Sequence, residues 1–228
     1  MKAPVRWMAP VLVLAATGLV AADASATGGW ETIRQEDGIV VARKEVPGSP
    51  FVALRGEGDV HASLLMVGSV LVDVPRDKEW IDGIVEARVL RRVSETEYIL
   101  YSHLGTPPTM SDRDFVTDVT IAVDPGQRTL VVRMRSVDDP AAPQTSYVRG
   151  DIEESAFILT QSPDGATTHV VAEIHCDPRG SVAAWMVNFF QKGWGYNTIS
   201  HLRAQLRKPD ISVHPALRKL LEDRGFPG

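Results

Sequence analysis

Three side chains in one short stretch of this chain have the chemistry that acid–base catalysis requires. They are His103, Asp112 and Asp114, and an imidazole beside carboxylates is able to move protons at the mouth of a pocket. Serine residues and Cys176 are present, but no nucleophile–base arrangement is recognisable, because the sequence has neither a Gly-x-Ser-x-Gly elbow nor a comparable signature. We therefore expect no catalytic residues, and keep an enzyme that uses these three groups as the alternative.

A second polar group consists of His169, Glu173 and His175, which share one face of a predicted strand. Imidazole and carboxylate groups bind zinc. The six histidines show no His-x-x-x-His or His-Glu-x-x-His spacing, however. We expect a solvated polar face here, with no metal and no cofactor.

The chain has one cysteine, Cys176, which cannot form a disulfide within the chain. It ends a run of residues that predicts a strand. We therefore expect a buried, unreactive thiol, and the packing of the core has to stabilise the fold without a cross-link.

Strands dominate the elements that must position these groups. Gly56 and Gly58 lie on one face of the second strand and predict a bend or a close backbone approach. Short turn-like connections between the strands favour antiparallel neighbours. The predicted strands are Ile39–Val46, Phe51–Val60, Ile84–Val93, Glu97–Leu104, Arg113–Val123, Thr129–Val137, Tyr147–Gly150, Ser155–Gln161 and Thr168–Cys176.

Helices are predicted before, between and after these strands. A short one starts at Trp30–Arg34, and a pair covers His61–Asp73 and Pro75–Ile81. A long amphipathic helix over Ser181–Leu206 has Ser181 as its N-cap. A short polar-faced helix, Pro215–Asp223, is expected outside the domain.

The long helix has one broad apolar stripe interrupted by Gly193 and Gly195. These glycines fit a hinge, a close packing contact or a break in the helix. The stripe begins with Val182, Trp185, Met186, Phe189 and Phe190. A strongly curved antiparallel sheet that wraps around this helix would bury the stripe, which predicts an α+β fold.

The first 26 residues have the pattern of a signal peptide. Lys2 and Arg6 precede an apolar run of about 16 residues, which is short for a membrane span, and Ala24-Ser25-Ala26 fits a cleavage site. We expect an exported protein, periplasmic if bacterial, with a retained anchor as the alternative. The predicted parts are a signal peptide (1–26), one domain (27–208) and a C-terminal tail (209–228).

Charge narrows the range of partners. Without residues 1–26 the chain has 22 basic and 28 acidic residues, a net charge of −6. This sign disfavours nucleic acid, which is captured by clustered Lys and Arg. It also disfavours broad attraction to anionic lipid, so we expect a monomer whose contact with a membrane surface is transient and local.

Several motifs, in order, resemble the START (steroidogenic acute regulatory-related lipid transfer) domain family. The resemblance runs from about Trp30 to Arg207, and one departure is Ala183, where the family usually has proline. The motifs are Trp30 with Asp37-Gly38-Ile39-Val40-Val41, Trp80, Arg113-Asp114-Phe115-Val116, the prolines Pro140 and Pro143 with Tyr147-Val148-Arg149-Gly150, and Asp177-Pro178-Arg179-Gly180 with Trp185 and Asn188.

The resemblance implies a helix-grip fold in which a curved antiparallel sheet and the C-terminal helix enclose an apolar cavity. The helix and a Pro-rich loop (138–146, with Pro140 and Pro143) would form a movable lid. Family members hold one sterol, phospholipid, ceramide or other hydrophobic molecule, so lipid binding and transfer are implied. A cyclase or hydratase with the same cavity and a ligand-sensing interaction module are the alternatives.

The ligand-binding residues expected on this basis are Leu100, Arg113, Phe115, Val119, Trp185, Met186 and Phe189. The three helix residues fit either a cavity roof or ordinary core. Arg113 and Asp114 fit head-group contacts or structural ion pairs, for example with Arg149. Leu100 and Val119 stand where sterol-binding relatives often bury an acid–arginine pair, which implies a cavity without that charged anchor.

Overall fold

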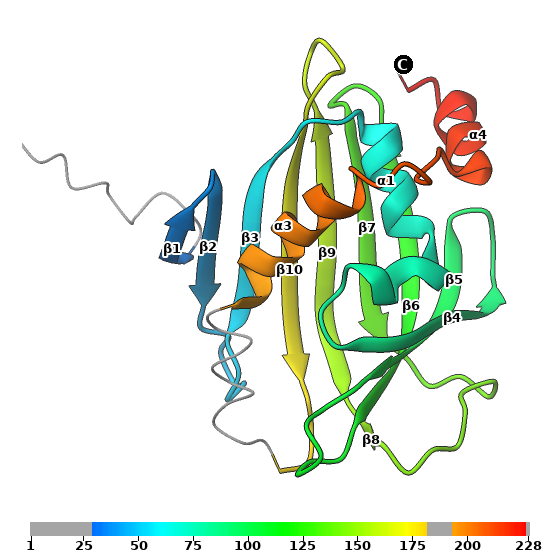
Figure 1. Ribbon diagram of the computed structural model, residues 1–228. Helices are drawn as coiled ribbons and strands as arrows, with labels where there is room; N and C mark the ends of the chain where they lie inside the picture. Colours follow the sequence, from blue (N-terminus) through cyan, green and yellow to red (C-terminus); the bar gives the residue numbers. More distant parts are fainter. Residues whose placement is uncertain (1–28, 182–192, 227–228) are drawn as a thin grey trace, which may run out of the picture.

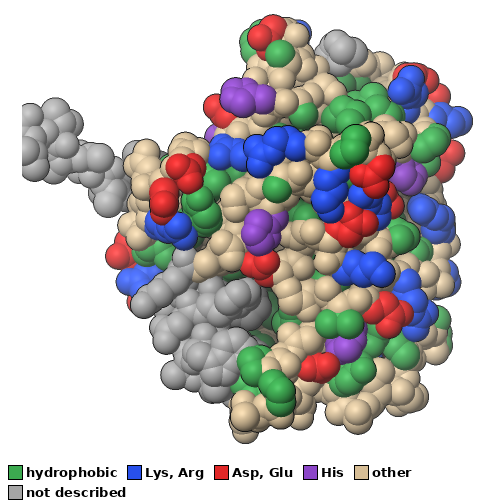
Figure 2. All heavy atoms as spheres, viewed as in Figure 1, with side chains coloured by type: hydrophobic (Ala, Val, Ile, Leu, Met, Phe, Trp, Pro, Cys, Tyr) green, Lys and Arg blue, Asp and Glu red, His purple; other side chains and the backbone are tan. Residues whose placement is uncertain are grey.

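The computed structural model of the protein describes residues 29–181 and 193–226. Within these ranges the chain forms one large sheet with helices on one of its faces (Figure 1). None of the described helices is long and apolar enough to cross a membrane. Acidic and basic side chains are interspersed over the described part of the face shown in Figure 2.

Ten described strands make up the sheet, in the order β1-β2-β3-β10-β9-β7-β6-β5-β4. All neighbours on this path are antiparallel, and the short strand β8 pairs with β6 in parallel. The strands are β1 (Glu31–Glu36), β2 (Ile39–Lys44), β3 (Ala53–Val60), β4 (Ile84–Arg92), β5 (Glu97–Leu104), β6 (Arg113–Asp124), β7 (Thr129–Ser136), β8 (Val148–Arg149), β9 (Asp151–Gln161) and β10 (Thr168–Asp177).

The N-terminal segment corrects one expectation, because Trp30–Arg34 does not start a helix. Residues Glu31–Glu36 form β1, which pairs with β2. Asp37 and Gly38 connect the two strands with positive φ angles of 52° and 67°. Two successive positive φ angles are the signature of the tight turn that matches the twist of a hairpin, so the Asp-Gly pair specifies a strand here.

Two helical segments lie between β3 and β4, as expected. Helix α1 (Leu64–Val72) begins after Ser63, whose hydroxyl accepts a hydrogen bond from the Met66 amide. A 3₁₀ segment, η2 (Val74–Glu79), follows with proline in its first turn. These segments place Asp77 and Trp80 beside the sheet.

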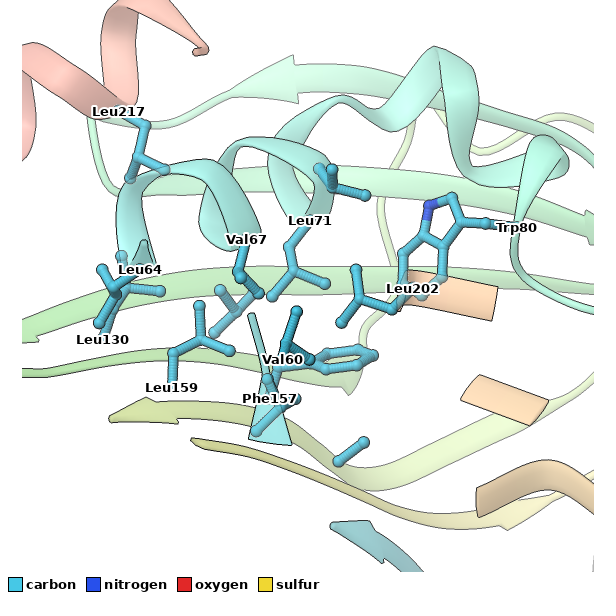
Figure 3. Close-up of a cluster of buried hydrophobic side chains, with 14 of the residues drawn as sticks. Val60, Leu64, Val67, Leu71, Trp80, Leu130, Phe157, Leu159, Leu202 and Leu217 are labelled. Carbon is cyan, nitrogen blue, oxygen red and sulfur yellow. The ribbon is translucent and has the colours of Figure 1, made fainter. Parts of the chain in front are cut away.

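The main core lies between α1 and the sheet. Figure 3 shows Leu64, Val67 and Leu71 of α1 directed toward Leu159 and Phe157. Each of these five side chains is at least nine-tenths buried. This end of the sheet is closely packed by the protein's own side chains.

Helix α4 (Pro215–Asp223) corrects a second expectation, because it is packed against the domain rather than outside it. Leu217, Leu220 and Leu221 are buried in the main core cluster. In Figure 3 Leu217 points toward α1, where a Cβ added at Gly68 would lie 2.9 Å from the Leu217 side chain. A glycine in α1 therefore makes room for α4.

Helix α3 (Gly195–Gln205) crosses the face of the sheet that α1 covers (Figure 1). It is the described part of the helix expected over Ser181–Leu206. Its first residue lies on β3 so closely that a Cβ added at Gly56 would be 2.3 Å from the Gly195 carbonyl oxygen. Gly195 is thus a close-packing glycine, and Gly56 makes the close backbone approach expected from its position.

Candidate functional site

A cavity of about 160 Å³ opens on the inner face of the sheet, beyond the packed end of the core. Its walls come from α1, η2, the loop that follows η2, the strands β4–β7, β9 and β10, and the start of α3. Most of the lining side chains are apolar. They are Leu71, Val74, Asp77, Trp80, Ile81, Asp82, Ile84, Tyr98, Leu100, Ser102, Leu104, Phe115, Thr117, Val119, Val132, Met134, Ile152, Ser155, Phe157, Ile174, Cys176, Trp194 and Thr198.

Trp80 and Phe157 mark the boundary between the packed core and the cavity. Their rings meet edge to face with centroids 6.2 Å apart, and both rings line the cavity. Such an arrangement is favourable for aromatic pairs. Figure 3 shows Leu202 of α3 beside them, so α3 also contributes to this boundary.

Three of the expected ligand-binding residues line the cavity. Leu100 projects from β5, and Phe115 and Val119 project from β6. Alternation along a strand places them on the inner face together with Thr117. Trp185, Met186 and Phe189, which were expected on the terminal helix, lie outside the described residues.

Arg113 does not line the cavity, although it was expected to contact a ligand. Its side chain is 1% exposed, and its guanidinium donates to backbone carbonyl oxygens of Ser111, Pro178, Arg179 and Ser181. A guanidinium has five donors in a fixed fork, which suits several carbonyls at once. These hydrogen bonds join the segment after β10 to the start of β6. The structural alternative for Arg113 was an ion pair, and no described residue forms one with it.

Asp114 forms the ion pair that was expected with Arg149. Its fully buried carboxylate accepts hydrogen bonds from Arg149 Nε at 2.7 Å and from Thr145 Oγ1 at 2.8 Å. Burial alone would raise the pKa of Asp114, but the hydrogen bonds from Arg149 and Thr145 bring that pKa below its ordinary value. Asp114 is therefore charged and already paired.

The Pro-rich loop 138–146 is fastened at both ends. Thr145 and Arg149 hold one end at Asp114, and Arg91 pairs with Asp139 at 2.7 Å at the other. Ala142 packs with Val137 against a small apolar cluster, Ile99, Tyr101 and Val116, that is separate from the main core. Neither of the expected lid residues Pro140 and Pro143 lines the cavity.

The remaining candidates for acid–base chemistry also lie away from the cavity. His103 Nε2 is 2.7 Å from Asp112 Oδ2, and the imidazole stacks on Tyr147 with centroids 4.2 Å apart. Burial alone would raise the pKa of Asp112, but hydrogen bonds from His103 and Thr106 lower it. None of His103, Asp112 and Asp114 is among the lining residues.

The residues considered as metal ligands pair with other side chains. His169 contacts Asp59, Glu173 accepts from Arg55, and His175 contacts both Glu153 and Ser49. Within residues 29–181 and 193–226, no group of three metal-ligating side chains comes together.

Cys176 is half-buried on the cavity wall, where burial raises the pKa of its thiol to about 12.

Sequence analysis did not identify two polar residues of the cavity wall, Asp77 and Tyr98. Asp77 and Tyr98 are 7% and 5% exposed, and both line the cavity. Burial, with a smaller effect of Asp73, raises the pKa of Asp77 well above its ordinary value. The one available signal was an acidic residue three positions before Trp80 in the short predicted helix Pro75–Ile81.

Contacts on both sides hold α3 over the sheet. Asn197 Nδ2 donates to Asp82 at 2.6 Å, and His201 Nδ1 lies 3.1 Å from the other oxygen of Asp82. At the opposite side, Tyr196 donates to Asp37 at 2.5 Å and Arg203 donates to backbone oxygens of Asp37 and Asp59. Because Asp82 also lines the cavity, the contacts of α3 with Asp82 lie at the edge of the cavity.

Comparisons with known proteins identify a matching family and a related bacterial protein. The model of the START domain matches residues 12–210 of the chain. The chain is 26% identical over 199 residues to the uncharacterized protein PA1579 of Pseudomonas aeruginosa, an alignment that covers 86% of this chain and 96% of that protein.

Two solved structures are similar over most of their length. A STAR-related lipid transfer protein fragment from Xanthomonas axonopodis is 28% identical with a TM-score of 0.68, covering 79% of this chain and 99% of that one. Human StAR-related lipid transfer protein 5 is 21% identical with a TM-score of 0.72, covering 80% of this chain and 88% of that one. The second likeness establishes the fold alone.

Proposed function

Because the chain belongs to the START domain family, we propose that it binds one lipid or similar hydrophobic molecule in the cavity and carries it between membranes. The observation that carries this proposal is an inner cavity whose wall is largely apolar and, among the described residues, contains no Lys, Arg or His. The similar structures named as lipid transfer proteins support a role in binding a hydrophobic ligand.

The physical basis of carriage is the cost of exposing an apolar chain to water. Each methylene group left in water costs about 0.8 kcal/mol, and an enclosed apolar cavity removes that cost during transit. Shape and a few polar contacts are sufficient for such a site. This role requires no reacting group in the cavity.

Exchange of the ligand would require α3 to move away from the sheet. We propose that the Asp82 contacts with Asn197 and His201 open in this step, because they join α3 to the cavity edge. The loop 138–146 would take part as a lid only if the buried Asp114 released Thr145 and Arg149. The α3 contacts are partly exposed, so their separation costs less than exposing the Asp114 pair.

An enzyme that uses the same cavity is the weaker alternative. His103, Asp112 and Asp114 are engaged in contacts away from the cavity wall. A general acid or base has to lie within hydrogen-bond reach of its substrate. These three residues do not support catalysis on a molecule held in the cavity.

We also propose that the protein works outside the cytoplasm, in the periplasm if the source is bacterial, after residues 1–26 are removed. The support is the positive start, the apolar run and the Ala-Ser-Ala sequence at residues 24–26. N-terminal sequencing of protein from a fractionated cell tests this. A chain that keeps residue 1 and stays in the cytoplasmic fraction contradicts it.

Two measurements test the carrier function. Native mass spectrometry of the protein purified from its own cell envelope should show a hydrophobic molecule bound one to a chain. Incubation with donor and acceptor liposomes should then accelerate movement of that molecule. Protein that carries no hydrophobic molecule and transfers none contradicts the proposal.

A further inference from the structure

Asp77 is an acidic side chain on the wall of a largely apolar cavity, and nothing in the packing of the fold requires it. It is 7% exposed, and no described residue donates a hydrogen bond to its carboxyl group or forms an ion pair with it. A buried polar group without a partner costs free energy that an apolar residue of similar size would avoid. A side chain kept at such a cost is a candidate for ligand recognition.

Trp80 follows the last residue of η2 and lines the same cavity as Asp77. The Trp80 amide donates to the Asp77 carbonyl oxygen at 3.2 Å, so the two residues are joined through the backbone. The ring of Trp80 lines the cavity, and its Nε1 has no acceptor among the described residues. The region around Asp77 therefore contains a hydrogen-bond donor, Trp80 Nε1, and a carboxyl group that both lack partners among the described residues.

Tyr98 completes this polar region from the facing strand β5. Its side chain lines the cavity, and its hydroxyl group has no hydrogen bond with any described residue. Burial raises the pKa of Tyr98, and the charge of Asp77 raises it further. The two groups are thus close enough to interact electrostatically and face the same space.

The rest of the wall restricts the charge of a ligand. No described lining residue is a Lys, an Arg or a His, so a phosphate or carboxylate would have no counter-charge and would meet Asp77. Asp82, the other acidic residue on the wall, is already bound to Asn197 and His201. An anionic head group is therefore disfavoured at this end of the cavity.

We propose that Asp77 and Tyr98 form the polar end of the cavity and select an uncharged lipid that carries a hydroxyl or carbonyl oxygen. The carboxyl group of Asp77 accepts a hydrogen bond whether or not it is protonated, and the phenol of Tyr98 both donates and accepts. A ligand hydroxyl satisfies both groups, whereas an alkane leaves them unpaired. This inference rests on the proposed function, because it assigns the ligand class of the same cavity.

The test is displacement of the dye N-phenyl-1-naphthylamine from the protein by four ligands with the same ten-carbon chain. These are 1-decanol, decane, decanoate and decylamine. We expect 1-decanol to bind about tenfold tighter than decane, as two satisfied hydrogen bonds predict. Decanoate should bind more weakly than 1-decanol.

Three variants separate the polar end from the rest of the wall. Asp77→Leu should weaken 1-decanol binding about tenfold and leave decane within about twofold. Tyr98→Phe should weaken 1-decanol binding about threefold. The control is Tyr101→Phe on the same strand β5, which removes a hydroxyl group from the separate cluster of Ile99, Tyr101 and Val116 and not from the cavity wall, and should leave the affinity unchanged.

The outcomes distinguish this inference from the proposed function. If neither the dye nor any decyl compound binds, the cavity does not hold hydrophobic molecules and the proposed function fails. If all four compounds bind but Asp77→Leu and Tyr98→Phe change nothing, or decylamine or decanoate binds tightest, the polar-end assignment is overturned while the proposed function stands. Should Asp77→Leu fail to fold by circular dichroism, the comparison of Tyr98→Phe with Tyr101→Phe decides.

Discussion

The backbone of Gly195 in α3 lies directly on Gly56 in β3. A Cβ atom on Gly56 would be 2.3 Å from the Gly195 carbonyl oxygen, and one on Gly195 would be 3.0 Å from the Arg55 carbonyl oxygen. Neither strand nor helix has room for a methyl group at this contact. The first turn of α3 can therefore lie directly against the sheet because neither of these two positions has a side chain.

Gly56→Ala should displace α3 and destabilise the protein. Overpacking a closely packed contact costs about 1–3 kcal/mol, and the added atom would meet the backbone of Gly195, which moves less readily than a side chain. The free energy of unfolding in urea measures the loss. The control is Gly126→Ala, where the added atom meets the Asp124 side chain at 3.3 Å; equal losses in the two variants contradict the assigned role of Gly56.

Replacement of Asp77 should stabilise the empty protein. Burial raises the pKa of Asp77 in the folded state, so folding favours the protonated form and stability falls as pH rises from about 3.8 through the folded pKa. Asp77→Asn should remove this dependence and be more stable than the wild type at neutral pH. Urea unfolding at several pH values checks this, and an identical pH dependence in both proteins would refute it.

Arg113→Met should lower stability strongly. The substitution removes the hydrogen bonds to the carbonyl oxygens of Ser111, Pro178, Arg179 and Ser181, and buried acceptors left without donors cost about 1–3 kcal/mol each. Arg113→Lys should not restore stability, because an ammonium group does not reproduce the planar fork. A lysine variant as stable as the wild type in thermal unfolding would show that charge alone is sufficient.

Arg149→Met should destabilise the protein more at pH 7 than in acid. The folded pKa of Asp114 is lowered by Arg149 and Thr145 against the effect of burial, so this pair stabilises above the unfolded pKa and loses its effect as pH falls through the folded pKa. Unfolding free energies at pH 7 and about pH 2 give the comparison. The same loss at both pH values would mean that the pair contributes through packing alone.

Asn197→Ala should speed release of a bound ligand. It removes one of the two contacts between α3 and Asp82 without changing a residue of the cavity wall, and changes of this kind act mainly on dissociation rates. Stopped-flow release of the naphthylamine dye measures the rate. Ser200→Ala on the same helix removes only a bond to the Asn197 carbonyl, and a matching acceleration in that control would contradict the role of the Asp82 contact.

Much of the fold was predictable because the signals are local. The strands from β4 to β7 follow from alternating apolar residues and turn residues, and α1 follows from apolar spacing after its cap at Ser63. The expected helix at Trp30–Arg34 was wrong because the Asp37-Gly38 turn, and not the preceding residues, decides the pairing of that segment. Helix α4 was predicted by its pattern, but its burial against α1 was not.

The sequence by itself determined the family, the antiparallel plan and the inward positions Leu100, Phe115 and Val119, because strand periodicity assigns each residue to a face. Only the tertiary structure decided that Arg113 binds backbone carbonyls, that the loop 138–146 is hydrogen-bonded to Asp114, and that Asp77 and Tyr98 line one cavity. Which side chains contact one another depends on the register of the strands and on where each helix packs against the sheet. The energy of a buried polar group depends on those neighbours and not on its own residue type.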